Sequence, residues 1–159
     1  GSRGITSSRP ALVSREMREA IVRTGYTFDT GGLVALEKRD RRLRLFLEQA
    51  LDHGWQVTVP SAVLVEWWRE PRDSPVPANW SESASVGQRK RILQAMLVEP
   101  LDERLAKIAG AAAGLVGASA VDAIVMASAA QRGDVVFTSD LSDLQRLQRV
   151  FPDVKLFRA

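Results

Sequence analysis

The sequence predicts an α/β protein in which a five-stranded parallel sheet is covered by helices on both faces. Five short apolar segments alternate with longer segments whose apolar residues recur at helical spacing. The short segments are apolar at almost every position, as in parallel strands that are buried on both faces. The chain has 159 residues, 45% of them hydrophobic, which is enough for one domain with a substantial core.

Turn and capping residues delimit the elements in the first half of the chain. Gly31 and Gly32 lead the first strand into a helix, and Pro60 ends the second strand. Ser61 is expected to be the N-cap of the next helix, and Pro71 to end that helix. The expected strands are residues 26–28 and 56–59, and the expected helices are residues 10–23, 33–38, 41–53 and 61–70.

The second half of the chain continues the alternation. Three prolines between residues 71 and 80 predict a loop, which a basic helix around residues 88–91 follows. Asp102 and Ser119 are expected to cap two long helices. The expected strands are residues 97–99, 134–138 and 154–157, and the expected helices are residues 103–115, 120–131 and 141–149.

Composition indicates the cellular compartment and the domain organisation of the protein. We interpret residues 1–24 as an expression scar followed by an amino-terminal helical extension, and residues 25–159 as one domain. The absence of cysteine excludes disulfides and thiolate metal sites and fits a reducing compartment. Because the chain has neither a run of about 18 apolar residues nor a signal peptide, we expect a cytoplasmic protein without a membrane span.

Four acidic residues are expected to meet at one edge of the sheet. Asp29 ends the first strand, and Asp140 follows the fourth. Glu66 and Asp122 lie in the early turns of helices that begin near the same edge, where ligands bind in open parallel sheets. A single aspartate after a strand is usually a helix cap, and Asp122 could complement a helix dipole. Four such acids in one place are harder to explain in this way.

The chemistry of these acids favours a divalent metal. Each has apolar neighbours in the sequence, and burying unpaired carboxylates costs several kcal/mol. Arg69 is the one basic residue near any of them along the chain. Carboxylate oxygens suit Mg²⁺ or Mn²⁺ and do not suit zinc. Such an ion activates water and stabilises charge on a phosphodiester.

Other catalytic chemistries lack their residues. His53 is the single histidine, so a ribonuclease with a histidine acid and a histidine base is excluded within one chain. The sequence contains no phosphate-binding loop of the G-x-x-x-x-G-K-[ST] type and no G-x-S-x-G elbow.

Four ordered motifs resemble those of the PIN-domain nucleases, and among them the VapC toxins of bacterial toxin–antitoxin pairs. Each motif is short, but their order and spacing span nearly all of residues 26–157. The motifs are Phe28-Asp29-Thr30, Pro60-Ser-Ala-Val-Leu-Val-Glu66, Val121-Asp122-Ala-Ile-Val-Met-Ala-Ser-Ala129 and Thr138-Ser-Asp140-Leu-Ser-Asp143-Leu144.

The resemblance implies a fold, a site and a set of partners. The fold is a PIN-like three-layer α/β/α sandwich, and residues 25–159 would be the PIN domain. The acid quartet Asp29, Glu66, Asp122 and Asp140 would bind Mg²⁺ or Mn²⁺, and would be both catalytic and metal-binding. Thr30 and Thr138 or Ser139 would support the site, while Asp143 would be either an additional acid or a helix-terminus residue. The implied function is endonucleolytic cleavage of RNA, often tRNA or another structured RNA, by a toxin that a cognate antitoxin neutralises and that forms a homodimer.

Basic residues offer a second set of candidates. The net charge is +3 and the pI about 9.8, and arginine predominates among the 22 basic residues. An arginine excess suits phosphate binding, but it equally follows from a GC-rich genome. The RNA-binding candidates are Arg69, Arg72, Arg89, Lys90 and Arg91.

Three further hypotheses remain open at this point. The alternative to a nuclease is a non-catalytic PIN-like module that binds RNA or protein through its basic face. Separately, about 20 residues precede the first strand, whereas members of the family usually begin close to it. This extension could dock on the acidic edge through its arginines and restrain activity. Trp67, Trp68 and Trp80 could stack on bases or form a dimer or antitoxin surface.

Overall fold

A computed structural model describes residues 25–69, 72–73 and 86–159, and its five strands form one all-parallel sheet. The strands are β1 (Tyr26–Phe28), β2 (Val57–Pro60), β3 (Leu97–Glu99), β4 (Val135–Thr138) and β5 (Lys155–Arg158). Their spatial order is β3-β2-β1-β4-β5. The predicted α/β class with a five-stranded parallel sheet is therefore confirmed. The predicted helix 10–23 and most of the predicted loop 71–80 lie outside the described residues.

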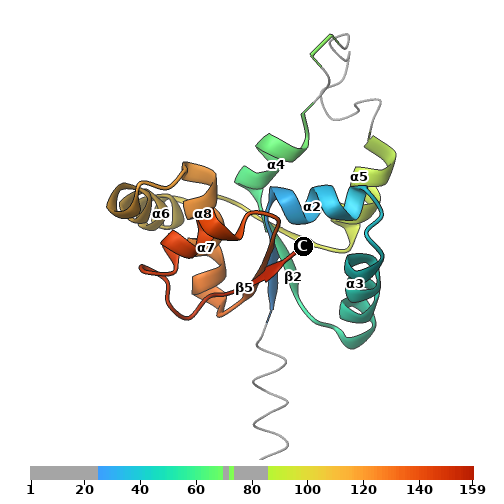
Figure 1. Ribbon diagram of the computed structural model, residues 1–159. Helices are drawn as coiled ribbons and strands as arrows, with labels where there is room; N and C mark the ends of the chain where they lie inside the picture. The colour runs from blue at the N-terminus through green and yellow to red at the C-terminus, as the bar shows by residue number, and fades with distance from the viewer. Residues whose placement is uncertain (1–24, 70–71, 74–85) are drawn as a thin grey trace, which may run out of the picture.

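Helices form a layer on each side of the sheet (Figure 1). One layer contains α6, α7 and α8, and the other contains α2, α3 and α5, with α4 at the carboxyl edge of the strands. No helix in the described ranges is long and apolar enough to cross a lipid bilayer. The helices are α2 (Thr30–Glu37), α3 (Arg41–His53), α4 (Ser61–Trp67), α5 (Val86–Gln94), α6 (Glu103–Val116), α7 (Ala120–Arg132) and α8 (Leu141–Leu147).

The core lies on both faces of the three central strands. Phe28, Val59 and Val136 are fully buried, as expected for strands covered by helices on both sides. α7 packs on β1, β2 and β4, and its residues from Ala123 to Ala129 are all buried. A helix buried over so long a run carries apolar or small residues all round, which explains its weak amphipathic pattern.

The helix starts confirm two predicted caps and correct a third. Asp102 accepts a hydrogen bond from the backbone of Leu105 at 2.8 Å, and Ser119 accepts one from Asp122 at 3.1 Å. The prediction that Ser61 caps α4 is wrong, because Pro60 occupies the cap position and offers no side-chain hydrogen bond. The Ser61 hydroxyl instead accepts a hydrogen bond from the backbone of Leu101 at 3.2 Å, across the chain.

A polar network that sequence reasoning did not predict connects α7 to the sheet. Arg132 forms ion pairs with Glu99 and, at 2.8 Å, with Asp134. It also donates to Ser128 and Thr27 at 2.9 and 3.0 Å, and Thr27 donates to Asp134 at 2.7 Å. The Asp134 side chain is almost completely buried, so its charge depends on this guanidinium.

We expect Arg132→Met to lower the free energy of unfolding by about 3 kcal/mol, because it leaves the buried Asp134 charge unpaired. Urea denaturation measures this loss. Lys107→Ala is the matched control, since Lys107 contacts Glu103 at 3.6 Å on an exposed helix face; it should change stability by less than about 0.5 kcal/mol. Equal losses for the two variants would contradict the assigned role of the network.

Candidate active site

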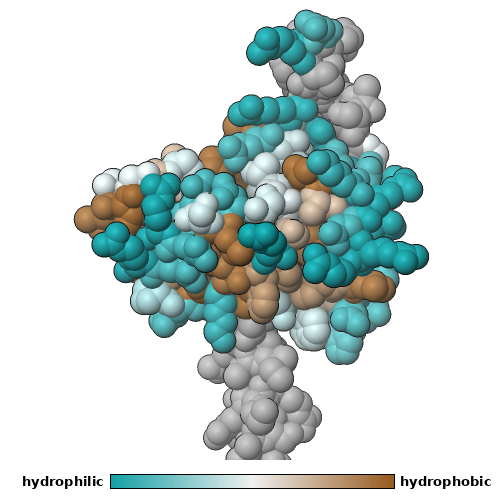
Figure 2. Space-filling view, viewed as in Figure 1, coloured by the Kyte–Doolittle hydropathy of each residue, from teal (hydrophilic) through white to brown (hydrophobic). Residues whose placement is uncertain are grey.

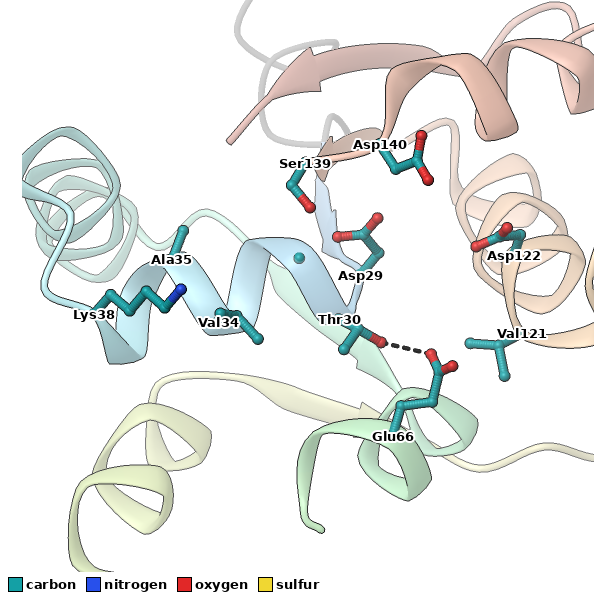
Figure 3. Close-up of a pocket in the computed structure, with 11 residues that line it drawn as sticks. Asp29, Thr30, Val34, Ala35, Lys38, Glu66, Val121, Asp122, Ser139 and Asp140 are labelled. Carbon is teal, nitrogen blue, oxygen red and sulfur yellow. Dashed lines mark hydrogen bonds between the residues drawn. The ribbon is translucent and has the colours of Figure 1, made fainter. Parts of the chain in front are cut away.

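A pocket of about 510 Å³ lies at the carboxyl edge of the sheet, where the strand order changes direction. β1 and β4 are adjacent there, and the helices that follow them, α2 and α8, lie on opposite faces. Such a switch point opens a crevice beyond the strand ends. All four predicted acids line this pocket, although they come from four separate segments: Asp29, Glu66, Asp122 and Asp140 (Figure 3).

Asp29 is the buried member of the quartet. It is the N-cap residue of α2, and its carboxylate accepts a hydrogen bond from the Gly32 backbone at 2.9 Å. Its pKa is raised from 3.8 to about 6, mainly by burial and in smaller part by the Asp122 charge, against the opposing effect of hydrogen bonds with Thr138 and Gly32. A raised carboxyl pKa of this kind is expected where no positive charge lies nearby.

The first turn of α2 passes very close to the loop after β4. A Cβ atom on Gly31 would overlap the Ser139 side chain and lie 2.9 Å from the Ser139 backbone nitrogen. Gly32 is similarly confined, since its Cβ would lie 2.9 Å from the Phe28 ring. The two glycines therefore allow the approach that brings Asp29 next to the segment carrying Asp140.

Glu66 and Asp122 approach the pocket from two further helices. Glu66 is exposed on α4 and accepts a hydrogen bond from the Thr30 hydroxyl at 2.8 Å, as Figure 3 shows. Asp122 is partly buried in the first turn of α7. Burial raises the pKa of Asp122, and the charges of Asp143, Glu66 and Asp140 add to this effect. Asp122 therefore interacts electrostatically with the other three acids across the pocket.

Asp140 is exposed at the rim of the pocket. A hydrogen bond with Asp143 and another from Ser142, at 3.1 Å, hold the pKa of Asp140 below its ordinary value. The same contact with Asp140 raises the pKa of Asp143. The Arg146 guanidinium lies 3.4 Å from the Asp143 carboxylate and offsets part of the repulsion between Asp143 and Asp140. Asp143 thus lies beside the quartet, in the first turn of α8.

The two predicted hydroxyl residues of the β4 loop have different surroundings. Thr138 is fully buried, and its hydroxyl oxygen accepts a hydrogen bond from the Asp140 backbone at 2.9 Å. Ser139 is exposed and lines the pocket. One residue therefore orders the loop, and the other faces the space between the acids.

Lys38 is the charged residue of the described pocket lining that sequence reasoning missed. It follows α2 directly, is exposed, and lines the pocket together with Val34 and Ala35. The signal was present in the helical periodicity, because Gly31, Val34, Ala35 and Lys38 recur at the spacing of a single helix face.

The predicted RNA-binding residues fall into two groups. Arg69, Arg72, Lys90 and Arg91 are exposed. Arg89 is mostly buried, pairs with Glu37 at 3.0 Å and lies over the Trp67 ring, so it joins α5 to α2 and α4.

Trp67 itself is buried and donates a hydrogen bond to Glu37 at 3.0 Å. The interpretation of Trp67 as a stacking or interface residue is therefore wrong, and Trp80 lies outside the described residues.

The donor set fits a hard divalent cation in chemistry, but it is not a preformed cage. Within the described ranges, no three carboxylates lie close enough together to hold a metal ion as they stand. Like charges around an open pocket repel, and the raised pKa values of Asp29 and Asp122 record that repulsion in part. An all-oxygen site that a cation would draw together suits Mg²⁺ or Mn²⁺.

Fold and site together define a parallel α/β sandwich with a carboxylate-lined pocket at its switch point. The family model of the PIN domain matches residues 26–150, and the chain belongs to the PIN-domain family. No curated protein sequence gives a significant match to it.

Several solved structures share the fold at low sequence identity. A chain of the DNA-bound VapBC complex from Salmonella typhimurium is similar with a TM-score of 0.65 and 16% identity, over 85% of this chain and 98% of that one. A chain of the DNA-bound VapBC2 complex from Rickettsia felis gives 0.63 and 13%, over 84% and 98%. A chain of a toxin–antitoxin complex from Klebsiella pneumoniae gives 0.55 and 20%, over 82% and 95%.

Gly31→Ala should lower the free energy of unfolding by about 1–3 kcal/mol and separate α2 from the β4 loop, because the added methyl group overlaps Ser139. Gly110→Ala on α6 is the control: its Cβ meets nothing within 4 Å, so it should raise stability by about 0.5–1 kcal/mol. Chemical denaturation measures both. A neutral or stabilising Gly31→Ala would contradict the close approach.

Asp29→Asn should stabilise the metal-free protein at alkaline pH. The pKa of this carboxyl is about 6 in the folded protein and 3.8 in the unfolded chain. Its stabilising contribution is therefore complete below pH 3.8 and is lost as the pH rises through 6. Asparagine does not ionise. The free energy of unfolding of the variant, relative to that of the wild type, should therefore rise by up to about 3 kcal/mol from pH 4 to pH 8. Denaturation in EDTA at both pH values tests this, and a gain that does not depend on pH would contradict it.

Proposed function

We propose that this chain is a Mg²⁺- or Mn²⁺-dependent endoribonuclease and the toxin of a type II toxin–antitoxin pair. The observation that carries the proposal is the single pocket lined by carboxylates from four separate segments. Within the described ranges no basic residue forms an ion pair with any of the four. A site that gathers negative charge in this way suits a cationic cofactor and a phosphodiester substrate.

The side chains divide the work of the proposed site. Asp29 and Asp140 would hold the metal ion directly, and Glu66 and Asp122 would hold it through oxygen or water or accept a proton. A bound Mg²⁺ or Mn²⁺ would stabilise charge on the phosphodiester and make water a better nucleophile. Thr30 fixes the direction of Glu66 through their 2.8 Å hydrogen bond. Hydrolysis in this manner leaves a 5′-phosphate and a 3′-hydroxyl.

The β4 loop and the basic residues would support this chemistry. Thr138, Ser139 and Asp143 would hold the orientation of Asp140 or of its water, since Thr138 and Asp143 already contact that residue. Phosphate contacts would position RNA, tRNA or another structured RNA, without reading its sequence. We keep the exposed candidates for this role: Arg69, Arg72, Lys90 and Arg91.

An antitoxin is the protein partner that fits this function. Structures of similar fold are VapBC and other toxin–antitoxin complexes. A second groove, of about 390 Å³, lies between α3 and α5. Its lining includes Leu47 and Ile92, and its three arginines, Arg39, Arg44 and Arg91, outnumber its one acid, Glu48. We assign it to an amphipathic antitoxin segment with acidic residues, because its charge and its apolar surface complement such a segment. A homodimer, which sedimentation would detect, completes the proposal.

The alternative is a non-catalytic module that binds RNA or protein. The observation that favours it is the lack of a ready metal cage in the described part of the chain. The two hypotheses differ in one result, because the module would bind RNA without cleaving it and without any effect of EDTA.

Asp29→Asn should reduce cleavage of bulk bacterial tRNA in Mg²⁺ by at least about a hundredfold, because it removes the buried metal ligand. Sequencing of RNA 5′ ends measures the loss, and EDTA should abolish cleavage by the wild type. Asp153→Asn is the control, since Asp153 is exposed in the turn before β5 and does not line the pocket; it should cleave like the wild type. Undiminished cleavage by Asp29→Asn would overturn the assignment.

A further inference from the structure

The pocket continues from the acid quartet along one face of α2. Residues Gly31, Val34, Ala35 and Lys38 all line it, and they lie on one stripe of this helix. The stripe offers small or aliphatic side chains until Lys38, where it ends in a positive charge (Figure 3). The pocket thus has carboxylates at one end and an ammonium group at the other, so its two ends differ in charge.

Lys38 is the one basic residue in the described lining of this pocket. Three arginines on α5, α7 and α8 have acidic partners: Arg89 pairs with Glu37, Arg132 with Glu99 and Arg146 with Asp143. No acid in the described part of the chain lies within ion-pair distance of Lys38. Its ammonium is therefore available to an anion from outside.

The position of Lys38 separates it from the acids themselves. Its Cα lies eight residues beyond Thr30, which is about 12 Å along a helix. In Figure 3 the Lys38 side chain is directed along α2, on the side of Val34 and Ala35, and its nitrogen does not lie among the carboxylates. An anion held there would share the pocket with a group bound at the acids.

We propose that Lys38 binds a backbone phosphate of the RNA next to the phosphodiester that is cleaved, and so sets the direction in which the strand crosses the pocket. This inference rests on the proposed nuclease function. Lysine acts as a point charge on phosphate, so the contact positions the strand without reading its bases.

Exposed apolar side chains do not dominate the face of the molecule drawn in Figure 2. Figure 2 shows the face seen in Figure 1 as mostly hydrophilic, with hydrophobic residues gathered at the end of α6 and near the middle. The most exposed large apolar side chain of the described residues, Leu115, belongs to α6 and not to the pocket lining.

The test begins with the RNA that the wild-type protein cleaves in bulk tRNA with Mg²⁺. A synthetic stem-loop that contains the mapped site then serves as substrate for Lys38→Ala, Lys38→Arg and the control Lys107→Ala, whose lysine is exposed on α6 and pairs with Glu103. Lys38→Ala should raise KM about tenfold with kcat within about twofold of wild type. Lys38→Arg should restore most of the loss, and Lys107→Ala should match the wild type.

Two further measurements identify the phosphate. The dependence of log(kcat/KM) on log salt concentration should become shallower by about 0.7 in Lys38→Ala, as expected for one lost phosphate contact on a single strand. A stem-loop with one uncharged methylphosphonate next to the cleavage site should be as poor a substrate for the wild type as the normal RNA is for Lys38→Ala. Combining the two changes should cost no more than either alone.

The outcomes separate the two proposals. If Lys38→Ala behaves like Lys107→Ala, or if its loss multiplies with that of every neutral linkage, the role of Lys38 is overturned while the nuclease stands. If the wild type does not cleave RNA in Mg²⁺, or if Asp29→Asn cleaves equally well, the nuclease function fails and the role of Lys38 fails with it.

Discussion

The pairing of β1 with β4 is the constraint on which the candidate site depends. It places the ends of two parallel strands side by side, while the helices that follow leave toward opposite faces of the sheet. The crevice between them cannot be filled by either helix, so Asp29 and the loop carrying Asp140 face a common space. Gly31 makes this arrangement possible, since it lets α2 pass against Ser139 without a side chain.

Charge is distributed unevenly around this framework. Asp134, the buried acid just before β4, has a guanidinium beside it, as do Asp143 and Glu37. Asp29 is also buried, yet it has only hydrogen bonds from Thr138 and the α2 backbone. The described part of the fold pairs Asp134, Asp143 and Glu37 with guanidinium groups but none of the four pocket acids, which supports the proposed divalent cation.

The fold was predictable from the sequence because its signals are local. Uninterrupted apolar runs marked the strands, and Asp102 and Ser119 marked helix starts. The error at Ser61 arose because its hydroxyl finds a partner across the chain, in Leu101, which no local pattern reveals. The Arg132 network escaped for the same reason, since its members lie on three separate segments.

The candidate site was predictable to the extent that strand ends define an edge. That rule located the four acids, whereas Lys38 required the phase of α2, which begins at Thr30 and not at the predicted Leu33. The burial of Trp67 likewise depends on packing of α4 against Glu37 and Arg89.

The central claim is that the four carboxylates share one divalent cation, and calorimetric titration of Mn²⁺ into the protein tests it most directly. We predict saturable binding to the wild type, loss of that binding in Asp29→Asn, and unchanged binding in Asp153→Asn. Equal binding by the wild type and Asp29→Asn, or no binding by the wild type, would contradict the account.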